Sequence, residues 1–494
     1  MILTGLAVGI ALGIVLQRGR FCVTGMLRDI FLQRSWRTFV ALLVVISVHA
    51  IGIAALTSLG VIAPEAPNFA PVAVIVGAFV FGMGIILAGG CASGTWYRAA
   101  EGLTGSWIAL AAYALSAAAM MTGPLSGFNA WMGSWETGLT TIPAAVGISP
   151  WFFALSLALV TFGLVRHFQR KAAALPKPAA LSSRPWWKRP IPFYTAGALV
   201  GVIGVIAWPL SAATGRNSGL GITAPSADVA GFIVTGAGTH INWGTMLVLG
   251  LFAGAFVAAK ASGEFRVRVP DATTLVRSGG GGTMMGVGAA LAGGCTVGNG
   301  MVQTSLFSFQ GWIALLFMAL GVGFAARIWL KPKEAEATAK TTAPGTYTTA
   351  ESLDNVQAPE APKSPAAVGA PAAAGASASA GPSPTRTTAP GPNPFAAAVP
   401  GVVALAPSGA PSQKLRDLGE GYYALDSLGA VCPFPLIEAK DVMTTLNPGD
   451  HLVIDFDCTQ ATEAIPQWAA EDGHTVTDFT EKGEASWQIT LEKA

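Results

Sequence analysis

The sequence predicts an all-α polytopic membrane protein with about nine transmembrane helices over residues 1–333, followed by a small α/β two-layer sandwich over residues 415–494. Three observations support this prediction. Hydrophobic residues make up 52% of the chain, charged residues only 11%, and there are 60 glycines. A glycine-rich motif occurs twice, and the composition changes abruptly after Lys333. Such a composition excludes a soluble enzyme as the description of the first part.

Nine apolar segments are long enough, or nearly so, to cross the hydrocarbon core of a bilayer. They cover residues 1–18, 38–60, 70–88, 106–122, 151–166, 191–208, 244–260, 280–303 and 311–329. The eighth is interrupted by several glycines. Lys and Arg are concentrated in residues 18–37, 166–189 and 260–277. In residues 61–70, 122–150 and 209–243 the one Lys or Arg residue is Arg216. Because short cytoplasmic loops retain cations, we expect an inner (plasma) membrane protein with its N-terminus outside and its C-terminus in the cytoplasm.

The repeated motif runs from Gly82 to Gly94 and again from Gly286 to Gly298, with eight of thirteen positions identical. Each copy contains Leu-Ala-Gly-Gly-Cys and ends an apolar segment, at Gly90-Cys91 and at Gly294-Cys295. The expected topology makes the first of these segments run inward and the second outward, so the copies are predicted to be inverted. Inverted repeats with broken or re-entrant helices are typical of transporters, whose site lies where the halves meet.

A third break is expected at 20–26, which contains Arg20 and Cys22. A weaker match aligns Gly9 and Gly13 with Gly250 and Gly254, and places Gly263 opposite Cys22. Polar sequence after the cysteines, such as Ser93–Arg98, must be buried in protein or line a cavity.

Cys22, Cys91 and Cys295 are therefore candidates to line a substrate pathway, with Gly90 and Gly294 beside them. The alternative is that these thiols are small packing residues. A disulfide is less attractive because three thiols leave one unpaired. No Cys-x-x-Cys occurs, and His49 and His240 are isolated, so neither a metal nor a cofactor is expected. The cations serve as topological signals, and no nucleic-acid binding is expected.

Residues 334–414 are rich in Ala, Pro, Ser, Thr and Gly and predict a disordered linker that tethers the last domain. Alternating apolar residues beyond it predict strands at 422–427, 451–456, 475–479 and 486–491, with helices at 435–446 and 459–471. Cys432 lies between the first strand and the first helix, where a helix N-terminus favours a thiolate and Pro433 and Pro435 suit the first turn. Cys432 is thus a candidate catalytic nucleophile. Cys458 is a candidate resolving thiol or a small buried residue.

The C-terminal eighty residues resemble the TusA-type sulfur carriers, through Cys-Pro-x-Pro at 432–435. Residues 1–330 resemble the YeeE/YedE sulfur-transport family, through Leu-Ala-Gly-Gly-Cys in both halves and a third cysteine after the first segment. The resemblance implies thiosulfate import, with Cys22, Cys91 and Cys295 as relay points and Cys432 as the residue that takes sulfane sulfur in the cytosol. It also implies that the last domain acts at the cytoplasmic face, with a cytosolic sulfur acceptor as a further partner.

Thiosulfate is a dianion with a soft terminal sulfur, which several weak S–H donors in series can bind and release. Its charge needs compensation, and helix N-termini, Arg20 and Arg98 are candidates for this role. Two other interpretations remain open. One is a membrane-embedded sulfurtransferase or thiol redox enzyme that moves no anion. The other is a transporter of another sulfur or selenium oxyanion.

Overall fold

The structure is a computed structural model that describes residues 2–173, 188–270, 272–329, 415–430, 434–483 and 485–494. Residues 1–333 and 413–494 form one compact unit. The predicted linker, 334–414, lies outside the described residues.

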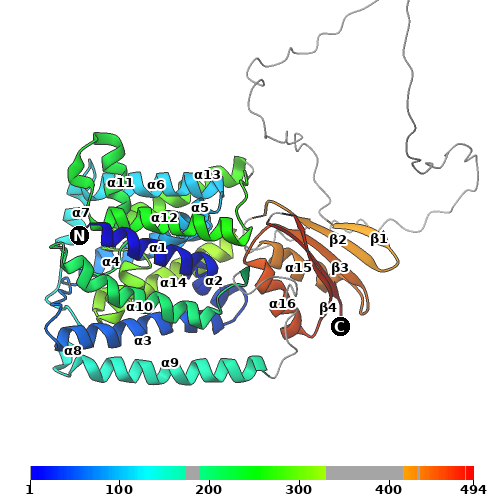
Figure 1. Ribbon diagram of the computed structural model, residues 1–494, viewed down its shortest axis with the longest axis horizontal. Coiled ribbons are helices and arrows are strands. Elements are labelled where there is room, and N and C mark those ends of the chain that lie inside the picture. Colours follow the sequence, from blue (N-terminus) through cyan, green and yellow to red (C-terminus); the bar gives the residue numbers. More distant parts are fainter. Residues whose placement is uncertain (1, 174–187, 271, 330–414, 431–433, 484) are drawn as a thin grey trace, which may run out of the picture. The chain divides into compact units, whose positions relative to one another are not determined.

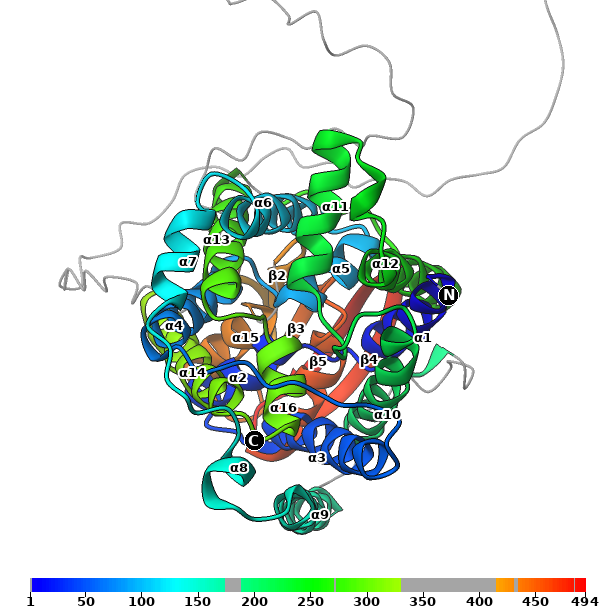
Figure 2. The ribbon, with the colours of Figure 1, turned by 90° about the vertical axis from the view of Figure 1, so that its left-hand side faces the viewer.

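The first part of the chain is helical (Figure 1). Its long helices are α1 (Leu3–Arg18), α3 (Arg37–Ser58), α4 (Pro71–Leu87), α6 (Thr104–Met121), α9 (Pro150–Ala173), α10 (Phe193–Ala212), α12 (Trp243–Ser262), α13 (Ala272–Leu291) and α14 (Phe309–Trp329). Shorter helices lie between them: α2 (Val23–Leu32), α5 (Ala92–Ala100), α7 (Ser126–Gly133), α8 (Ile142–Val146), α11 (Thr223–Thr235), a 3-10 helix η2 (Gly238–His240) and a π-helix η3 (Gly298–Gln303). In Figure 2, α2 and α5 lie inside the ring of longer helices, and α9 lies at its edge.

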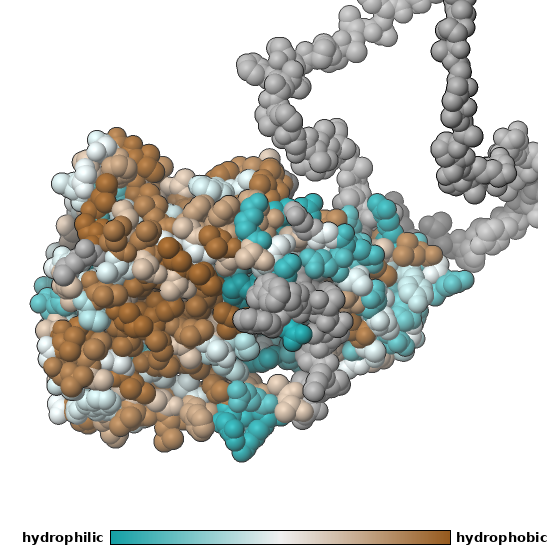
Figure 3. Space-filling view, viewed as in Figure 1, coloured by the Kyte–Doolittle hydropathy of each residue, from teal (hydrophilic) through white to brown (hydrophobic). Residues whose placement is uncertain are grey.

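Eight helical segments among the described residues have the length and hydropathy to cross a bilayer, and they make this a multi-pass membrane protein. They correspond to eight of the nine predicted spans. The ninth, 280–303, is not one continuous helix, because α13 begins earlier, at Ala272, and ends at Leu291 before the π-helix η3. Apolar side chains cover much of the face of the bundle that is seen in Figure 3, and within α9 only 11% of the apolar window is buried.

Helices α4 and α13, which carry the two copies of the motif, pack against each other and run in opposite directions. Gly77 faces Gly288, and Gly84, further along α4, faces Gly281, further back along α13. A Cβ atom at Gly84 would lie only 2.8 Å from the carbonyl oxygen of Gly281. The prediction that the copies are inverted is therefore confirmed for these helices.

The weaker match between the first and seventh predicted spans has a different basis. Helices α1 and α12 run parallel, since Gly9 faces Leu247 and Gly13 faces Leu251. The close approach is made by glycines of both helices: Gly5, Gly9, Gly13, Gly250 and Gly254. Because the two helices are parallel, they are not related by the inversion that relates α4 to α13. Their similar spacing reflects a shared packing interface.

The C-terminal region is a five-stranded mixed sheet with two helices, α15 (Phe434–Thr445) and α16 (Ala461–Asp472), on one face (Figure 1). The strand order is β1 (Leu415–Gly419), β2 (Tyr422–Ser427), β3 (His451–Phe456), β5 (Ser486–Glu492) and β4 (Thr475–Gly483). Strands β2 and β3 are parallel, and the other neighbours are antiparallel. This confirms the predicted two-layer sandwich and adds β1, which the sequence reading missed.

Candidate functional site

The two copies of the repeated motif end their helices in the same way. Gly89, after α4, has φ = 71°, and Gly293, after α13, has φ = 70°. This left-handed conformation at a helix end favours glycine, because a Cβ atom there is strained. The chain then turns back into the bundle at Cys91 and Cys295, which are both fully buried.

Cys22 and Cys91 occupy equivalent places at the starts of two short helices. Cys22 is the N-cap residue of α2 and Cys91 the N-cap residue of α5, and both have extended backbone conformations. Neither side chain makes a capping hydrogen bond. The first amide groups of a helix have no partner within the helix, so both thiols lie beside a positive helix end. The expected break at residues 20–26 is thus confirmed.

The Cys22 and Cys91 thiols are close enough to interact directly. A Cβ atom on Gly94 would lie 3.3 Å from both sulfur atoms, so this glycine leaves the space between them open. The sulfur of Cys91 also lies 3.5 Å from the hydroxyl of Ser93. All nine residues of α5 are buried, as the polar sequence after Cys91 required.

The two glycines that precede the repeated cysteines are in different surroundings. A Cβ atom on Gly90 would meet its nearest neighbour at 3.5 Å, an ordinary contact, whereas one on Gly294 would lie 3.3 Å from the side chain and backbone of Asn299. Asn299 donates hydrogen bonds to the carbonyls of Ala292 and Gly294 at 2.7 and 3.0 Å. Gly294 is thus tightly packed, while Gly90 has room for a methyl group.

Cys295 lies near a tyrosine that sequence reasoning did not single out. The hydroxyl of Tyr113 interacts with Cys295 and donates a hydrogen bond to the hydroxyl of Thr223 at 3.0 Å. Thr296, which follows the cysteine, is fully buried, and its hydroxyl has no hydrogen-bond partner in the part of the chain described here. Hydroxyl groups therefore accompany the thiol in this second half.

Arg20 is one member of a buried charged network between α1 and α2. Its backbone has φ = 47°, which is rare for a residue other than glycine and is typical of functional sites. Its guanidinium lies 3.1 Å from a carboxylate oxygen of Glu264, which also accepts a hydrogen bond from Gln17 at 2.8 Å. Gln17 contacts Glu101 at 3.3 Å as well. The charge of Arg20 is therefore already balanced within the protein.

Arg98 is held differently. Its guanidinium donates a hydrogen bond to the carbonyl of Gly89, in the break before Cys91, and lies beside the side chain of Tyr97. Arg98 is 7% exposed and Tyr97 2% exposed. Among the described residues, no ion pair joins Arg98 to a carboxylate. Its position near Cys22 leaves its charge available to an anion.

The functional part of the C-terminal region lies where the parallel strands β2 and β3 end. The amide of Gly429, after β2, donates to the carboxylate of Asp457, after β3, at 3.0 Å. Cys432 and Pro433 lie outside the described residues. Pro435 is buried in the first turn of α15. Cys458 is 5% exposed and takes part in a disulfide bond.

Three polar contacts between described residues join the C-terminal region to the helical part within the same compact unit. Arg20 donates a hydrogen bond to the hydroxyl of Thr462 and lies 3.8 Å from the carboxylate of Glu463. Arg268, in the loop after α12, lies 3.6 Å from the carboxylate of Asp457. Since Asp457 also accepts the hydrogen bond from the amide of Gly429, it links Arg268 to the loop after β2.

The two histidines considered as metal ligands are engaged elsewhere. His49 is buried, accepts a hydrogen bond from the indole of Trp208 at 3.1 Å, and lies 3.2 Å from the hydroxyl of Ser305. His240 lies 3.4 Å from the carboxylate of Asp228. The described residues contain no group of three or more His, Cys, Asp or Glu side chains arranged to hold a metal ion.

The residues that sequence reasoning missed are single polar side chains: Thr24, Tyr97, Tyr113, Thr296 and Arg268. Thr24 and Thr296 had a usable signal, since each follows a candidate cysteine within two positions, and Tyr97 lies in the polar sequence Ser93–Arg98 that was expected to be buried or to line a cavity.

Comparisons with known proteins show what each part of the chain is similar to. Residues 18–324 match the Sulphur transport family, and residues 423–493 match Sulfurtransferase TusA. The chain is 48% identical over 335 residues to the thiosulfate transporter TsuA of Escherichia coli (strain K12), a match that covers 67% of this chain and 94% of that protein. It is 33% identical over 340 residues to the TsuA of Spirochaeta thermophila, with 65% and 97% covered. Its last part is 63% identical over 70 residues to TsuB of Escherichia coli, a proposed sulfur carrier, with 14% and 93% covered.

Proposed function

Because this chain belongs to the Sulphur transport family and has a TusA region at its C-terminus, we propose that it carries thiosulfate across a membrane and passes sulfane sulfur to its own C-terminal domain. The single observation that carries the proposal is the meeting of Cys22 and Cys91, two buried thiols at the starts of two helices.

This arrangement suits an anion with a soft terminal sulfur. The helix N-termini of α2 and α5 offer backbone amides and a partial positive charge, which favour a dianion. The thiols offer weak S–H donors to the sulfane sulfur. Weak contacts in series allow an anion both to enter and to leave, as conduction requires. In this proposal the thiols stay neutral and form no covalent bond with the substrate.

The proposed pathway runs from Cys295 to Cys91 and then to Cys22. Tyr113 interacts with Cys295 and lies near Cys91, which supports a connection between the first two positions. Gly89 and Gly293 provide the tight turns before the thiols, and Gly90 and Gly294 lie between these turns and the cysteines. Of the two arginines, Arg98 is the better candidate to meet the anion, since Arg20 is paired with Glu264.

We place the N-terminus outside and the C-terminal domain in the cytoplasm, from the distribution of cations between the spans. The domain boundaries follow as 1–333, 334–414 and 415–494. The contacts of Arg20 with Thr462 and of Arg268 with Asp457 support docking of the C-terminal domain on the cytoplasmic face.

The proposed chemistry in the cytoplasm is a transfer of sulfur to Cys432. Its thiolate attacks the sulfane sulfur of thiosulfate, the S–S bond of thiosulfate breaks, and sulfite leaves with the bonding electron pair, so that Cys432 becomes a persulfide. Pro433 and Pro435 fix the start of the helix that favours this thiolate. Cys458 is the candidate resolving thiol, and a cytosolic acceptor would receive the sulfur.

The test is uptake of radiolabelled thiosulfate by proteoliposomes that contain the full chain. We expect Cys91→Ala and Cys295→Ala to abolish uptake, while Cys91→Ser, which keeps the shape but loses the soft sulfur, reduces it. Cys432→Ala should allow thiosulfate binding but stop sulfite release. Excess sulfate should not compete.

Normal uptake by Cys91→Ala would overturn the transport pathway. Covalent sulfur found on Cys91 or Cys295 during turnover, without accumulation of thiosulfate inside, would instead favour a membrane-embedded sulfurtransferase.

A further inference from the structure

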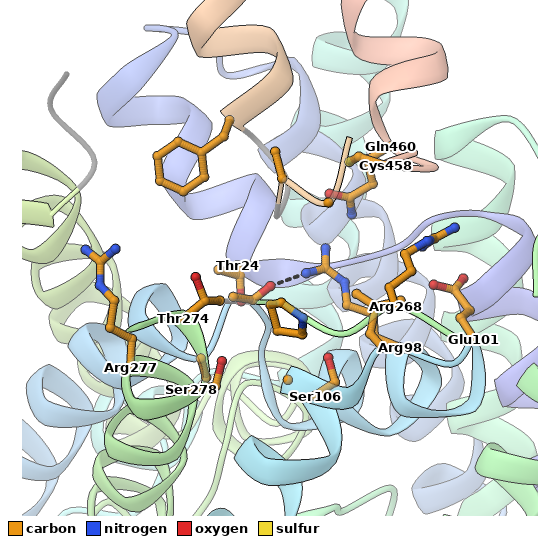
Figure 4. Close-up of a pocket in the computed structure, with 18 of the residues that line it drawn as sticks. Thr24, Arg98, Glu101, Ser106, Arg268, Thr274, Arg277, Ser278, Cys458 and Gln460 are labelled. Atoms are coloured by element: carbon orange, nitrogen blue, oxygen red, sulfur yellow. Dashed lines mark hydrogen bonds between the residues drawn. The ribbon is translucent and has the colours of Figure 1, made fainter. Parts of the chain in front are cut away.

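A cavity of about 330 Å³ lies along α2 and α5. Thr24, Tyr97 and Arg98 line it from the two short helices, and Arg268 lines it from the loop after α12. Figure 4 shows Thr24, Arg98 and Arg268 around the same space, with Arg277 on the opposite side. The cavity has ample room for a small anion and several waters.

The cavity is rich in guanidinium groups. Five arginines line it: Arg20, Arg28, Arg98, Arg268 and Arg277. Three of them have carboxylate partners, because Arg20 pairs with Glu264, Arg28 with Asp29 and Arg268 with Asp457. The other two donate to backbone carbonyls, Arg98 to that of Gly89 and Arg277 to that of Trp329.

Acidic side chains also line the cavity, namely Glu101, Glu438 and Asp457. Glu101 is 3% exposed and contacts Gln17, and Glu438 accepts a hydrogen bond from Ser427 at 2.7 Å. Each acid thus already has a partner of its own. Arg98 and Arg277 are left, among the described residues, without an ion pair to a carboxylate.

Four polar atoms of three wall residues have no hydrogen-bond partner in the described part of the chain. They are the hydroxyl oxygens of Thr24 and Tyr97 and the Nε and Nη2 atoms of Arg268, and Thr24 is 3% exposed. Buried polar groups are nearly always hydrogen-bonded, and leaving one unsatisfied is costly. Their position in a cavity lined with arginine indicates a ligand that accepts hydrogen bonds.

We propose that this cavity binds the SO₃ group of a sulfur oxyanion, with Thr24, Arg98 and Arg268 as donors. The inference rests on the proposed function and adds one step to the proposed pathway: the cavity is the site that the anion occupies after it leaves Cys22. Guanidinium groups bind tetrahedral oxyanions through charge-assisted hydrogen bonds, whereas thiols suit the soft sulfur. The hard end of thiosulfate and the sulfite released from it share this chemistry.

Arg98 links the thiols, which suit the sulfane sulfur, to the guanidinium groups, which suit the SO₃ group, because it lies on α5, whose N-cap residue is Cys91. An anion that leaves the Cys22 thiol with its sulfane end last would meet the cavity with its SO₃ end first. The segments after β2 and β3, including Gly429 and Cys458, line the same cavity. Sulfite formed at the C-terminal domain would therefore be released into the same site.

The test is isothermal titration calorimetry of the full chain in detergent, under reducing conditions and with Cys432→Ala to prevent turnover. Sulfite and thiosulfate are titrated separately. We expect Thr24→Val and Arg268→Gln to weaken binding of sulfite by roughly ten- to hundredfold, the effect of losing a charge-assisted hydrogen bond. Arg266→Gln is the matched control, since Arg266 is exposed and does not line the cavity.

Thr24→Ser and Arg268→Lys, which keep a donor, should retain much of the affinity and so separate loss of a contact from misfolding. Tighter binding of sulfite than of thiosulfate would identify a product site, and the reverse an entry site for the substrate. The inference would be overturned if Arg268→Gln and Thr24→Val bound sulfite as tightly as the control Arg266→Gln. If the unmutated chain took up no thiosulfate in proteoliposomes but bound sulfite more tightly than Arg268→Gln, the transport proposal would be refuted and the cavity site would stand.

Discussion

Replacing Gly9 by alanine tests whether α1 and α12 are held together by direct backbone contact. The new Cβ atom would lie 2.1 Å from the carbonyl oxygen of Leu247 and 2.9 Å from the amide nitrogen of Leu251. Ordinary contacts of a Cβ atom begin at 3.4 Å. The two helices must therefore move apart by about an ångström, since a backbone carbonyl cannot rotate away as a side chain can.

The magnitude follows from two opposing terms. Overpacking costs typically about 1–3 kcal/mol, with a rigid backbone neighbour at the upper end. Alanine in place of glycine within a helix gains up to about 1 kcal/mol. The net loss is about 1–2 kcal/mol, which corresponds to a fall in apparent melting temperature of roughly 2–8 °C for a domain of this size.

The assay is thermal unfolding in detergent, followed with a fluorogenic maleimide that reacts with exposed thiols. The three cysteines of the helical part are at most 3% exposed, so the dye reports the opening of the bundle. Gly163→Ala is the control, because this glycine lies in α9 with nothing within 4 Å of a new Cβ atom. If Gly9→Ala melted at or above the temperature of Gly163→Ala, the packing argument would be refuted.

Three further predictions concern other parts of the chain. Burial, with the neighbouring Glu264, raises the pKa of Glu101 from 4.5 to about 7. Between these pH values the folded state binds more protons than the unfolded state, so the stability of the protein should fall as the pH rises from about 4.5 to about 7. Glu101→Gln should make the melting temperature less dependent on pH in this range. His49→Ala should destabilise the bundle by about 1–3 kcal/mol, because it leaves the indole of Trp208 buried without its acceptor, and melting temperature is the readout. Leu452→Ala, at a fully buried position of β3, should cost about 2–5 kcal/mol and make the C-terminal domain, but not the helical part, sensitive to limited proteolysis.

Much of the fold could be predicted because burial imposes a period on the sequence. In the C-terminal domain, Trp487, Ile489 and Leu491 alternate with half-buried residues, and the predicted strand agrees with β5 to within one residue. Strand β1 was missed because it is an edge strand whose last four residues are exposed, so it carries no alternation.

The helical part shows where such reasoning stops. Long apolar segments were found because a bilayer demands them, but α13 begins with polar residues at Thr273, Thr274 and Arg277, and its first half does not look like a span. The short helix α5 was expected only as a break, since all of its faces are buried and no polar face marks it as a helix. Which polar side chains surround the thiols is decided by packing between distant helices, and nothing in the local sequence of Tyr113 or Arg268 reports it.

The choice of cysteine at the two N-caps is itself informative. Serine, threonine, aspartate and asparagine are preferred at this position, because their oxygens accept hydrogen bonds from the first amides of the helix. Cys22 and Cys91 make no such bond, so both helices give up about 0.5–2 kcal/mol of capping. A residue chosen only for stability would be serine. The expected behaviour of Cys91→Ser follows directly: its hydroxyl should cap α5 and raise the melting temperature while it competes with the anion for the same amides and lowers uptake. Opposite signs for stability and transport distinguish a ligand-binding thiol from a packing residue, for which serine would lower stability and leave uptake unchanged.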